Sequence, residues 1–216
     1  METYLSSKCF EEMGETMGKK VLIATVYNPD PVLLAATKLG PDRLILLLDE
    51  KPDREQDKAL KLIQDSLGKV IEVKTVKCAV YDVVKVASKC VEIIDMQPKE
   101  DVVYVNITSG RKTKAIGLLF AAYARHDRVK KIAYNPEEDK GLVVYLPRLS
   151  FKLTESQKKI LEYVDAGNYA SIKELSEKID LSTAMLYRAI DELKDMDLIS
   201  VEDGLKLTDA GKIARL

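Results

Sequence analysis

Apolar residues form two kinds of pattern along the first two thirds of the chain, one typical of strands and one typical of helices. Short apolar runs rich in β-branched residues predict buried strands over residues 20–25, 43–48, 69–76, 101–108, 129–135 and 142–147. Between them, apolar residues at helical spacing predict helices over residues 32–40, 52–68, 81–96 and 109–126. Strands that alternate with helices favour a parallel sheet covered on both faces. The last two strands are joined by a short segment with Pro136 and Gly141, which predicts an antiparallel pair.

The pattern changes after Pro147, where helical segments follow one another without strands between them. Residues 153–167, 171–180 and 181–199 have apolar residues at helical spacing. Each segment starts with a capping residue: Thr154 with Gln157 three residues later, Ser171 with Glu174, and Ser182 or Thr183. Asp203-Gly204 then predicts a hairpin turn between two short strands. Three helices followed by a hairpin is the order of a winged helix-turn-helix.

The chain is therefore predicted to have an α/β fold, a Rossmann-like, mostly parallel sheet followed by a small winged helix-turn-helix domain. The predicted boundaries are an N-terminal extension over 1–19, the sheet domain over 20–147, a linker over 148–153 and the winged helix over 154–216.

Composition narrows the possible functions. The 216 residues include 34 basic and 35 acidic side chains, a net charge of −1, which excludes a generally polycationic nucleic-acid coat. No apolar run is long enough to span a membrane, and the start lacks the apolar core of a signal peptide. Three scattered cysteines (Cys9, Cys78 and Cys90) indicate a reducing cytoplasm and neither a disulfide frame nor a zinc site. His126 is the single histidine, so one chain cannot build a two-histidine metal site.

Candidate chemistry lies where two predicted strands end, over residues 25–30 and 106–113. Ligands of open parallel sheets bind beyond the carboxyl ends of the strands. In the second segment Gly110 lets backbone amides approach a ligand, the helix start favours an anion, and Arg111 and Lys112 add positive charge. The hydroxyl donors there are Thr108, Ser109 and Thr113. These features suit a phosphate, although the segment is neither a P-loop nor a dinucleotide fingerprint, and a capped helix with solvated cations explains it equally well.

The helix predicted after residue 181 is the recognition helix of the winged domain. Leu186, Ile190 and Leu193 fall on its core face, which leaves an outer face for DNA. The residues assigned to DNA binding are Ser182, Thr183, Tyr187, Arg188, Lys194 and Lys206. Residues 153–216 hold 9 basic and 13 acidic side chains, so an isolated winged helix should bind DNA weakly. A winged helix used for protein contacts is the alternative.

With both halves in place, the chain resembles the CRISPR-associated Rossmann fold (CARF) regulators, archaeal transcription factors with a sensor domain and a winged helix. The matching loop residues are Asn106, Thr108, Ser109, Gly110, Arg111 and Lys112, and residues 25–30 match the other pocket segment of that family. The resemblance implies a homodimer that binds double-stranded DNA and holds a cyclic oligoadenylate, most often cyclic tetra-adenylate, across its two-fold axis. It assigns ligand contacts to Thr25, Val26, Tyr27, Asn28, Asn106, Thr108, Ser109, Gly110, Arg111, Lys112 and Thr113.

The resemblance also raises two enzymatic possibilities. Some relatives carry a HEPN-type RNase domain, which needs an arginine several residues before a histidine. Here Arg125 directly precedes His126 and no histidine follows, so this activity is rejected. Other relatives cleave their cyclic ligand without a metal, and the 106–113 loop could stabilise the charge of that reaction. Because Asp30 is the only carboxylate in the two loops, we expect a regulator without a cofactor rather than an enzyme.

Overall fold

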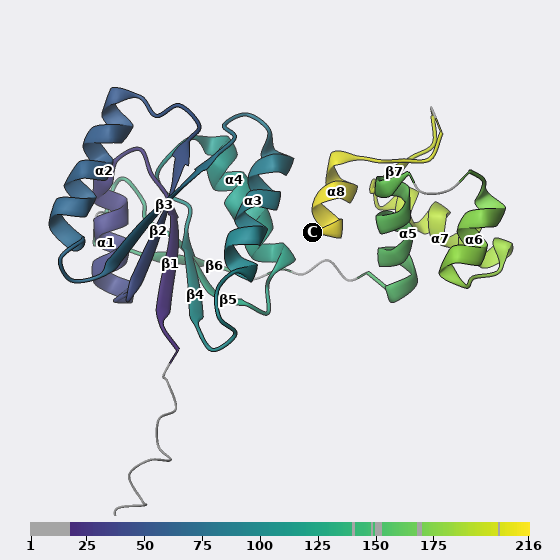
Figure 1. Ribbon diagram of the computed structural model, residues 1–216, viewed down its shortest axis with the longest axis horizontal. Helices are drawn as coiled ribbons and strands as arrows, with labels where there is room; N and C mark the ends of the chain where they lie inside the picture. The colour runs from purple at the N-terminus through teal and green to yellow at the C-terminus, as the bar shows by residue number, and fades with distance from the viewer. Residues whose placement is uncertain (1–17, 140, 148, 150–152, 168–169, 203) are drawn as a thin grey trace, which may run out of the picture.

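The computed structural model describes residues 18–139, 141–147, 149, 153–167, 170–202 and 204–216. Its first part is a six-stranded sheet in the order β3-β2-β1-β4-β5-β6, in which only β6 is antiparallel to its neighbour (Figure 1). The strands are β1 (Lys20–Thr25), β2 (Arg43–Asp49), β3 (Glu72–Cys78), β4 (Val102–Asn106), β5 (Val129–Tyr134) and β6 (Val144–Leu146). This confirms the predicted mostly parallel sheet and its antiparallel end.

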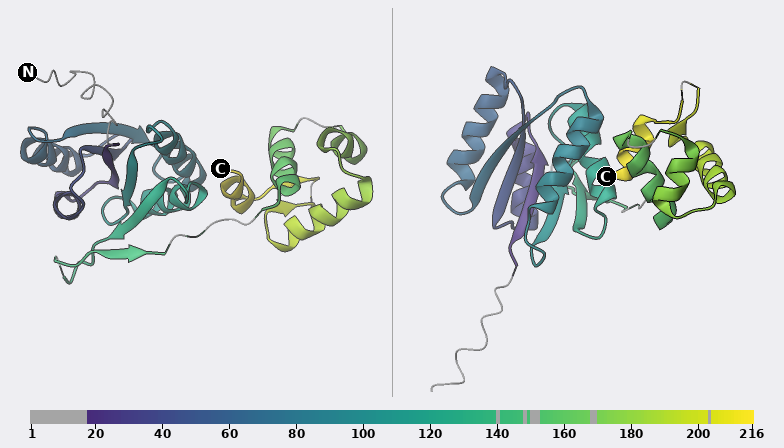
Figure 2. Two further views of the ribbon diagram at one scale, coloured as in Figure 1. Left: turned by 90° about the horizontal axis from the view of Figure 1, so that it is seen from below. Right: turned by 45° about the vertical axis from the view of Figure 1, so that its right-hand side comes forward.

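Four helices cover the two faces of the sheet, α1 (Pro29–Leu39) and α2 (Arg54–Leu67) on one face and α3 (Val83–Asp95) and α4 (Lys112–Ala124) on the other (Figure 2). Successive strand residues point to opposite faces, so each strand contributes to two cores. In β1, Leu22 and Ala24 pack under α1 and α2, whereas Val21 and Ile23 pack under α3 and α4. The cores thus explain why the strands read as continuous apolar runs.

Several predicted strands extend beyond the observed strands, and the structure shows why two of them do. Residues 69–71 do not belong to β3, because the amides of Val70 and Ile71 bond back to the Leu67 carbonyl and close the turn after α2. β4 ends at Asn106 because the side-chain oxygen of Asn106 accepts a bond from the Thr108 amide and turns the chain out of the sheet. The second turn places residues 107–113 beside the end of β1.

The second part is a winged helix-turn-helix, as predicted. Its helices are α5 (Glu155–Ala166), α6 (Ile172–Ile179) and α7 (Thr183–Asp195), and its wing strands are β7 (Ile199–Ser200) and β8 (Lys206–Leu207). Thr154 and Gln157 form the predicted capping box, and the side chains of Ser171 and Ser182 cap α6 and α7. Among the described residues, no helix has both the length and the apolar character needed to cross a membrane.

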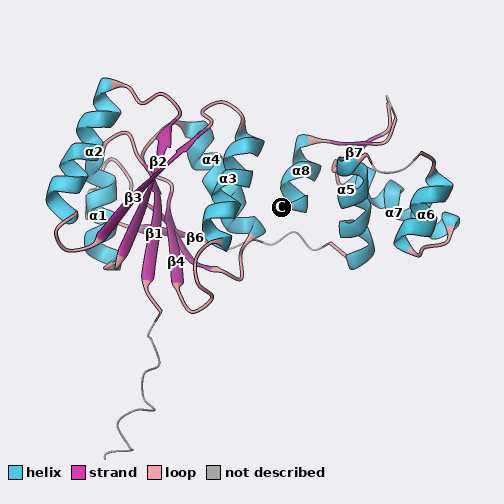
Figure 3. Cartoon of the chain, viewed as in Figure 1, coloured by secondary structure: helices cyan, strands magenta, loops and turns pink. Residues whose placement is uncertain are grey.

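A final helix, α8 (Asp209–Arg215), joins the two parts of the molecule and was not expected to do so. It contacts α5 and β8 on one side and α3 and α4 on the other (Figures 1 and 3). Ile213 is buried, and Leu216, just after the helix, packs against the core beneath α3 and α4. Arg125, at the end of α4, pairs with Asp95 at 2.7 Å and donates to the Leu216 carbonyl. The end of α4 is thereby connected to the winged helix.

Candidate functional site

The sheet order creates one position where neighbouring strands lead into connections that run in opposite directions. β1 and β4 lie side by side, yet β1 is followed by α1 on one face and β4 by α4 on the other. The crevice between such strand ends is where open α/β sheets bind ligands. Residues 25–30 and 106–113 meet at this crevice, as expected from their position after β1 and β4.

Ser109 joins the two loops. Its Oγ accepts hydrogen bonds from the backbone amides of Tyr27 (2.9 Å) and Asn28 (2.8 Å) and donates to the Asn28 carbonyl (3.0 Å). The Thr25 hydroxyl donates to the Ser109 carbonyl in return. Ser109 is buried, and its one hydroxyl proton is used within the protein. In this structure Ser109 therefore positions the two loops, and its hydroxyl donates no bond toward the crevice.

Gly110 lets the loops approach this closely. Its φ of +91° is in a region that residues with a side chain rarely adopt. A Cβ at this position would lie 3.0 Å from the Thr25 Cβ and 3.3 Å from the Val26 nitrogen. Glycine is thus required here by both conformation and space.

A cavity of about 680 Å³ opens beside these loops. The β1 loop and α1 contribute Tyr27, Asn28, Asp30, Pro31, Leu33 and Leu34, the β4 loop contributes Thr108, Ser109 and Gly110, and the segment after β5 contributes Asn135, Pro136 and Glu137. This volume is in the range of pockets for small-molecule ligands. Asp30 falls in the predicted segment 25–30, whereas Pro31, Leu33, Leu34 and the three residues after β5 were not predicted. Asn135 follows the strand next to β4 and could have been found from that position.

Two asparagines and a threonine join the ends of β4 and β5 beside the cavity. The side-chain amide of the buried Asn106 donates to the Asn135 side-chain oxygen at 2.8 Å, and the Thr108 hydroxyl accepts from the Asn135 backbone amide at 2.7 Å. The Asn135 side-chain amide donates to the Leu142 carbonyl at 3.3 Å, which reaches the segment before β6. The ends of β4 and β5 are therefore held together, and Thr108 remains half-buried at the cavity wall.

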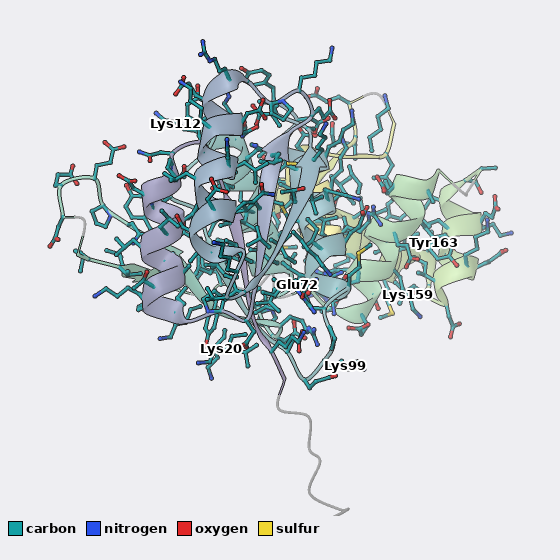
Figure 4. The ribbon with its side chains drawn as sticks, turned by 60° about the vertical axis from the view of Figure 1, so that its left-hand side comes forward. Lys20, Glu72, Lys99, Lys112, Lys159 and Tyr163 are labelled. Carbon is teal, nitrogen blue, oxygen red and sulfur yellow. The ribbon has the colours of Figure 1, made fainter. Side chains whose placement is uncertain are left out.

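The three predicted contacts at the start of α4 point in different directions. Arg111 extends away from the cavity toward β2 and α2, where its Nε lies 3.5 Å from the Asp49 carboxylate. Lys112 is exposed, and Figure 4 shows it at the opposite end of the sheet domain from Lys20 and Lys99. The Thr113 hydroxyl donates to the Val80 carbonyl in the loop before α3. Of the eleven assigned ligand residues, Thr25, Val26 and Asn106 are fully buried, and Tyr27, Asn28, Thr108, Ser109 and Gly110 line the cavity.

A buried ion pair that the sequence did not suggest lies below Arg111. Lys114 on α4 is fully buried, pairs with the buried Asp49 and donates to the Leu47 carbonyl at 3.2 Å. Gln56 donates its side-chain amide to the Val26 carbonyl at 2.8 Å and accepts from the Asp49 amide at 2.9 Å. Burying a charge is costly unless it is paired and hydrogen-bonded, and both partners are satisfied here.

The recognition helix α7 exposes the face that was assigned to DNA. Leu186, Ile190 and Leu193 are buried as expected, while Tyr187 is 53% exposed. The predicted DNA residues are all exposed: Ser182, Thr183, Tyr187, Arg188, Lys194 and Lys206. Arg188 lies 3.2 Å from Glu192 on the same helix, so part of its charge is balanced. Met185, which was not assigned, is also exposed on the first turns of α7.

Family comparisons match both parts of the chain. Residues 20–139 match the N-terminal domain model HFX_2341_N, and residues 153–200 match a model of the winged helix-turn-helix DNA-binding domain. The second part is thus a winged helix-turn-helix of the DNA-binding type. A search of curated proteins gave no match.

Solved structures give distant similarities. VC1899 from Vibrio cholerae aligns with a TM-score of 0.50 and 11% sequence identity. The alignment covers 91% of this chain and 64% of that protein, which indicates a shared fold. Can2 from Sulfobacillus thermosulfidooxidans, solved with cyclic tetra-adenylate, aligns with a TM-score of 0.49 and 16% identity, over 90% of this chain and 63% of that one. Csm6 from Enterococcus italicus, bound to cyclic hexa-2′-fluoro-hexa-dAMP, aligns with a TM-score of 0.48 and 16% identity, over 85% of this chain and 56% of that one. The chain spans less than two thirds of each of these proteins.

Proposed function

The chain belongs to the HFX_2341_N family through residues 20–139, and on that premise we propose that it is a ligand-responsive, DNA-binding transcriptional regulator. Its sheet domain binds a cyclic oligoadenylate, with cyclic tetra-adenylate the first candidate, and its winged helix binds promoter DNA. The observation that carries the proposal is the cavity at the end of β1 and β4, in the same chain as a DNA-binding domain. The resemblance of residues 106–112 to the CARF loop supports the ligand class and a role in a CRISPR system.

The cavity suits part of such a ligand. Its apolar wall of Pro31, Leu33, Leu34 and Pro136 can cover a nucleobase. A pocket of about 680 Å³ is too small for a whole ring of four nucleotides. Two copies of the chain related by a two-fold axis would supply two equivalent cavities to a symmetric ring.

The path from ligand to DNA runs through α4. This helix begins at the loop that carries Ser109 and Gly110 and ends at Arg125, which pairs with Asp95 and contacts Leu216. A ligand that shifts the first turn of α4 therefore acts on the surface against which α8 packs. By thermodynamic linkage, the ligand and DNA then change each other's affinity by the same factor.

The ligand assignment is tested by calorimetric titration of the full chain with cyclic tetra-adenylate. We expect one ring per two chains, weaker binding for Lys112→Ala, and unchanged binding for Lys99→Ala, which removes the same charge at the opposite end of the sheet (Figure 4). Absence of binding by the wild type would remove the oligoadenylate assignment and leave the fold.

The DNA assignment is tested by fluorescence anisotropy with a labelled mixed-sequence duplex over a salt series. We expect Arg188→Ala to weaken binding and to reduce the salt slope by about 1, as for the loss of one phosphate contact. Lys99→Ala, on the sheet domain, is the control. A protein that binds the ring but no duplex at low salt would instead use its winged helix for protein contacts.

Cleavage of the bound ring is a second candidate function, favoured by one observation. Glu137 and Asp30 both line the cavity, so a second carboxylate joins the one noted in the loops. In the reaction, a ribose 2′-oxygen attacks the adjacent phosphorus and the 5′-oxygen leaves. One carboxylate accepts the 2′-hydroxyl proton and a protonated group returns a proton to the 5′-oxygen, which gives a 2′,3′-cyclic phosphate and a 5′-hydroxyl. Chromatography of the recovered ligand tests this: intact rings exclude cleavage, whereas linear product that disappears with Glu137→Gln supports it.

A further inference from the structure

The side chain of Arg111 is held by three groups on the β2 side of the crevice. Its Nε lies 3.5 Å from Asp49 Oδ2, its Nη2 lies 3.6 Å from Asp53 Oδ2, and its guanidinium carbon lies 5.3 Å from the centre of the Tyr27 ring. The Tyr27 hydroxyl donates to the same Asp53 oxygen at 3.1 Å. Arg111 itself does not line the cavity, although the preceding Ser109 and Gly110 do. The guanidinium is therefore held beside the cavity and directed away from it.

The two carboxylates that hold Arg111 differ in whether a second cation balances their charge. Asp49 is buried and its other oxygen pairs with the fully buried Lys114, so its charge is balanced without Arg111. Asp53 is at the surface, with a side chain 43% exposed, and Arg111 is the cation that faces it at 3.6 Å. Asp53 also caps α2 by accepting from the Gln56 amide at 2.9 Å, and this bond, together with Tyr27 and Arg111, lowers the pKa of Asp53. Asp53 is consequently ionised at neutral pH.

We propose that Asp53 is an internal competitor for Arg111 and sets the affinity of the site for phosphate. This inference rests on the proposed function, since it concerns the same crevice. A phosphate oxygen of the ligand replaces the exposed Asp53 carboxylate on the guanidinium, and Asp49 remains paired with Lys114. The guanidinium fork suits either acceptor, because carboxylate and phosphate both present two oxygens at a similar spacing.

Asp53→Asn tests this competition with little structural change. Asparagine caps helices as well as aspartate does, so the bond from Gln56 to the cap can persist while the charge is lost. Because an exposed ion pair is worth little in water, we expect cyclic tetra-adenylate to bind Asp53→Asn about two- to fivefold more tightly than the wild type at low salt. The gain should shrink as salt is raised.

Three controls separate the contact from a general change in charge. Asp53→Glu keeps the charge and should not tighten binding. Asp82→Asn makes the same replacement at the cap of α3, where Asp82 accepts from the Lys85 amide at 3.0 Å and does not pair with Arg111. It should leave affinity nearly unchanged. In an Arg111→Ala background, Asp53→Asn should have no effect, because the pair no longer exists.

Inorganic tripolyphosphate, titrated in parallel, distinguishes failure of this inference from failure of the proposed function. If cyclic tetra-adenylate does not bind the wild type but tripolyphosphate binds Asp53→Asn more tightly, the competition stands and the ligand class is wrong. If either probe binds and Asp53→Asn is no tighter than the wild type, or Asp82→Asn gains as much, the competition is wrong. If neither probe binds any variant, both proposals fall.

Discussion

Removing the Ser109 hydroxyl should loosen the contact between the β1 and β4 loops. Ser109→Ala deletes three hydrogen bonds, to the Tyr27 and Asn28 amides and to the Asn28 carbonyl. A neutral hydrogen bond contributes about 0.5–1.5 kcal/mol to stability, so the three together are worth roughly 1.5–4.5 kcal/mol. Since Tyr27 and Asn28 are at the surface, water can replace part of what is lost. We therefore expect a decrease of about 2–3 kcal/mol in the free energy of unfolding.

The assay is urea unfolding followed by far-UV circular dichroism, with the midpoint and the slope compared between variants. Ser88→Ala is the matched control, because the Ser88 hydroxyl donates only to the Val84 carbonyl within α3. A bond of that kind, from a serine to the preceding turn of its own helix, adds little, so Ser88→Ala should stay within about 0.5 kcal/mol of the wild type. A Ser109→Ala protein as stable as the wild type, or a Ser88→Ala protein that loses as much, would refute the reasoning.

Three further results are expected. Gly117→Ala should destabilise the protein by about 1–2 kcal/mol in thermal or urea unfolding, because its Cβ would lie 2.5 Å from Val86 Cγ1 and 2.7 Å from Val86 Cβ on α3, and a variant as stable as the wild type would contradict this packing. Glu72 has its pKa lowered from 4.5 to about 2 by hydrogen bonds from Lys74 and Arg43. Its stabilising effect is therefore complete above pH 4.5 and lost as pH falls toward 2, and the stability gap between the wild type and Glu72→Gln should close over that range. Burial raises the pKa of the Cys78 and Cys90 thiols, so in a Cys9→Ser variant a thiol reagent at pH 8 should react only after unfolding, and rapid reaction of the native protein would contradict the structure.

Local signals in the sequence were sufficient for much of the fold. Helix caps such as Thr154 with Gln157 need only neighbouring residues, and the structure forms them as expected. Apolar periodicity likewise placed Leu186, Ile190 and Leu193 in the core of the winged helix. Periodicity did not give the strand ends, because Asn106 ends β4 through a hydrogen bond from the Thr108 amide to its side chain, which competes with the pairing of the strands.

The position of the site could be predicted from the sequence, but the contacts between its side chains could not. The loops after β1 and β4 could be found because each follows an apolar strand. Arg111 reads as a phosphate ligand in sequence, yet Asp49 and Asp53, 62 and 58 positions away, face it in the structure. Glu137 lines the cavity because it follows β5, and β5 lies beside β4 in the sheet. Such contacts depend on which strands are neighbours, and periodicity along the chain carries no information about that.

The contact of α8 with the sheet domain has a consequence for how separable the two parts are. Leu216 packs against the core cluster beneath α3 and α4, and α8 contacts both helices, so residues 20–147 expressed alone would expose apolar surface there to water. Exposed apolar patches promote self-association. A sheet domain truncated at the linker would therefore lack part of its packing. A chimera with a different DNA-binding domain would need a segment that packs on α3 and α4 in place of α8. In this chain the sequence boundary between the sheet domain and the winged helix does not coincide with the boundary of the packed core.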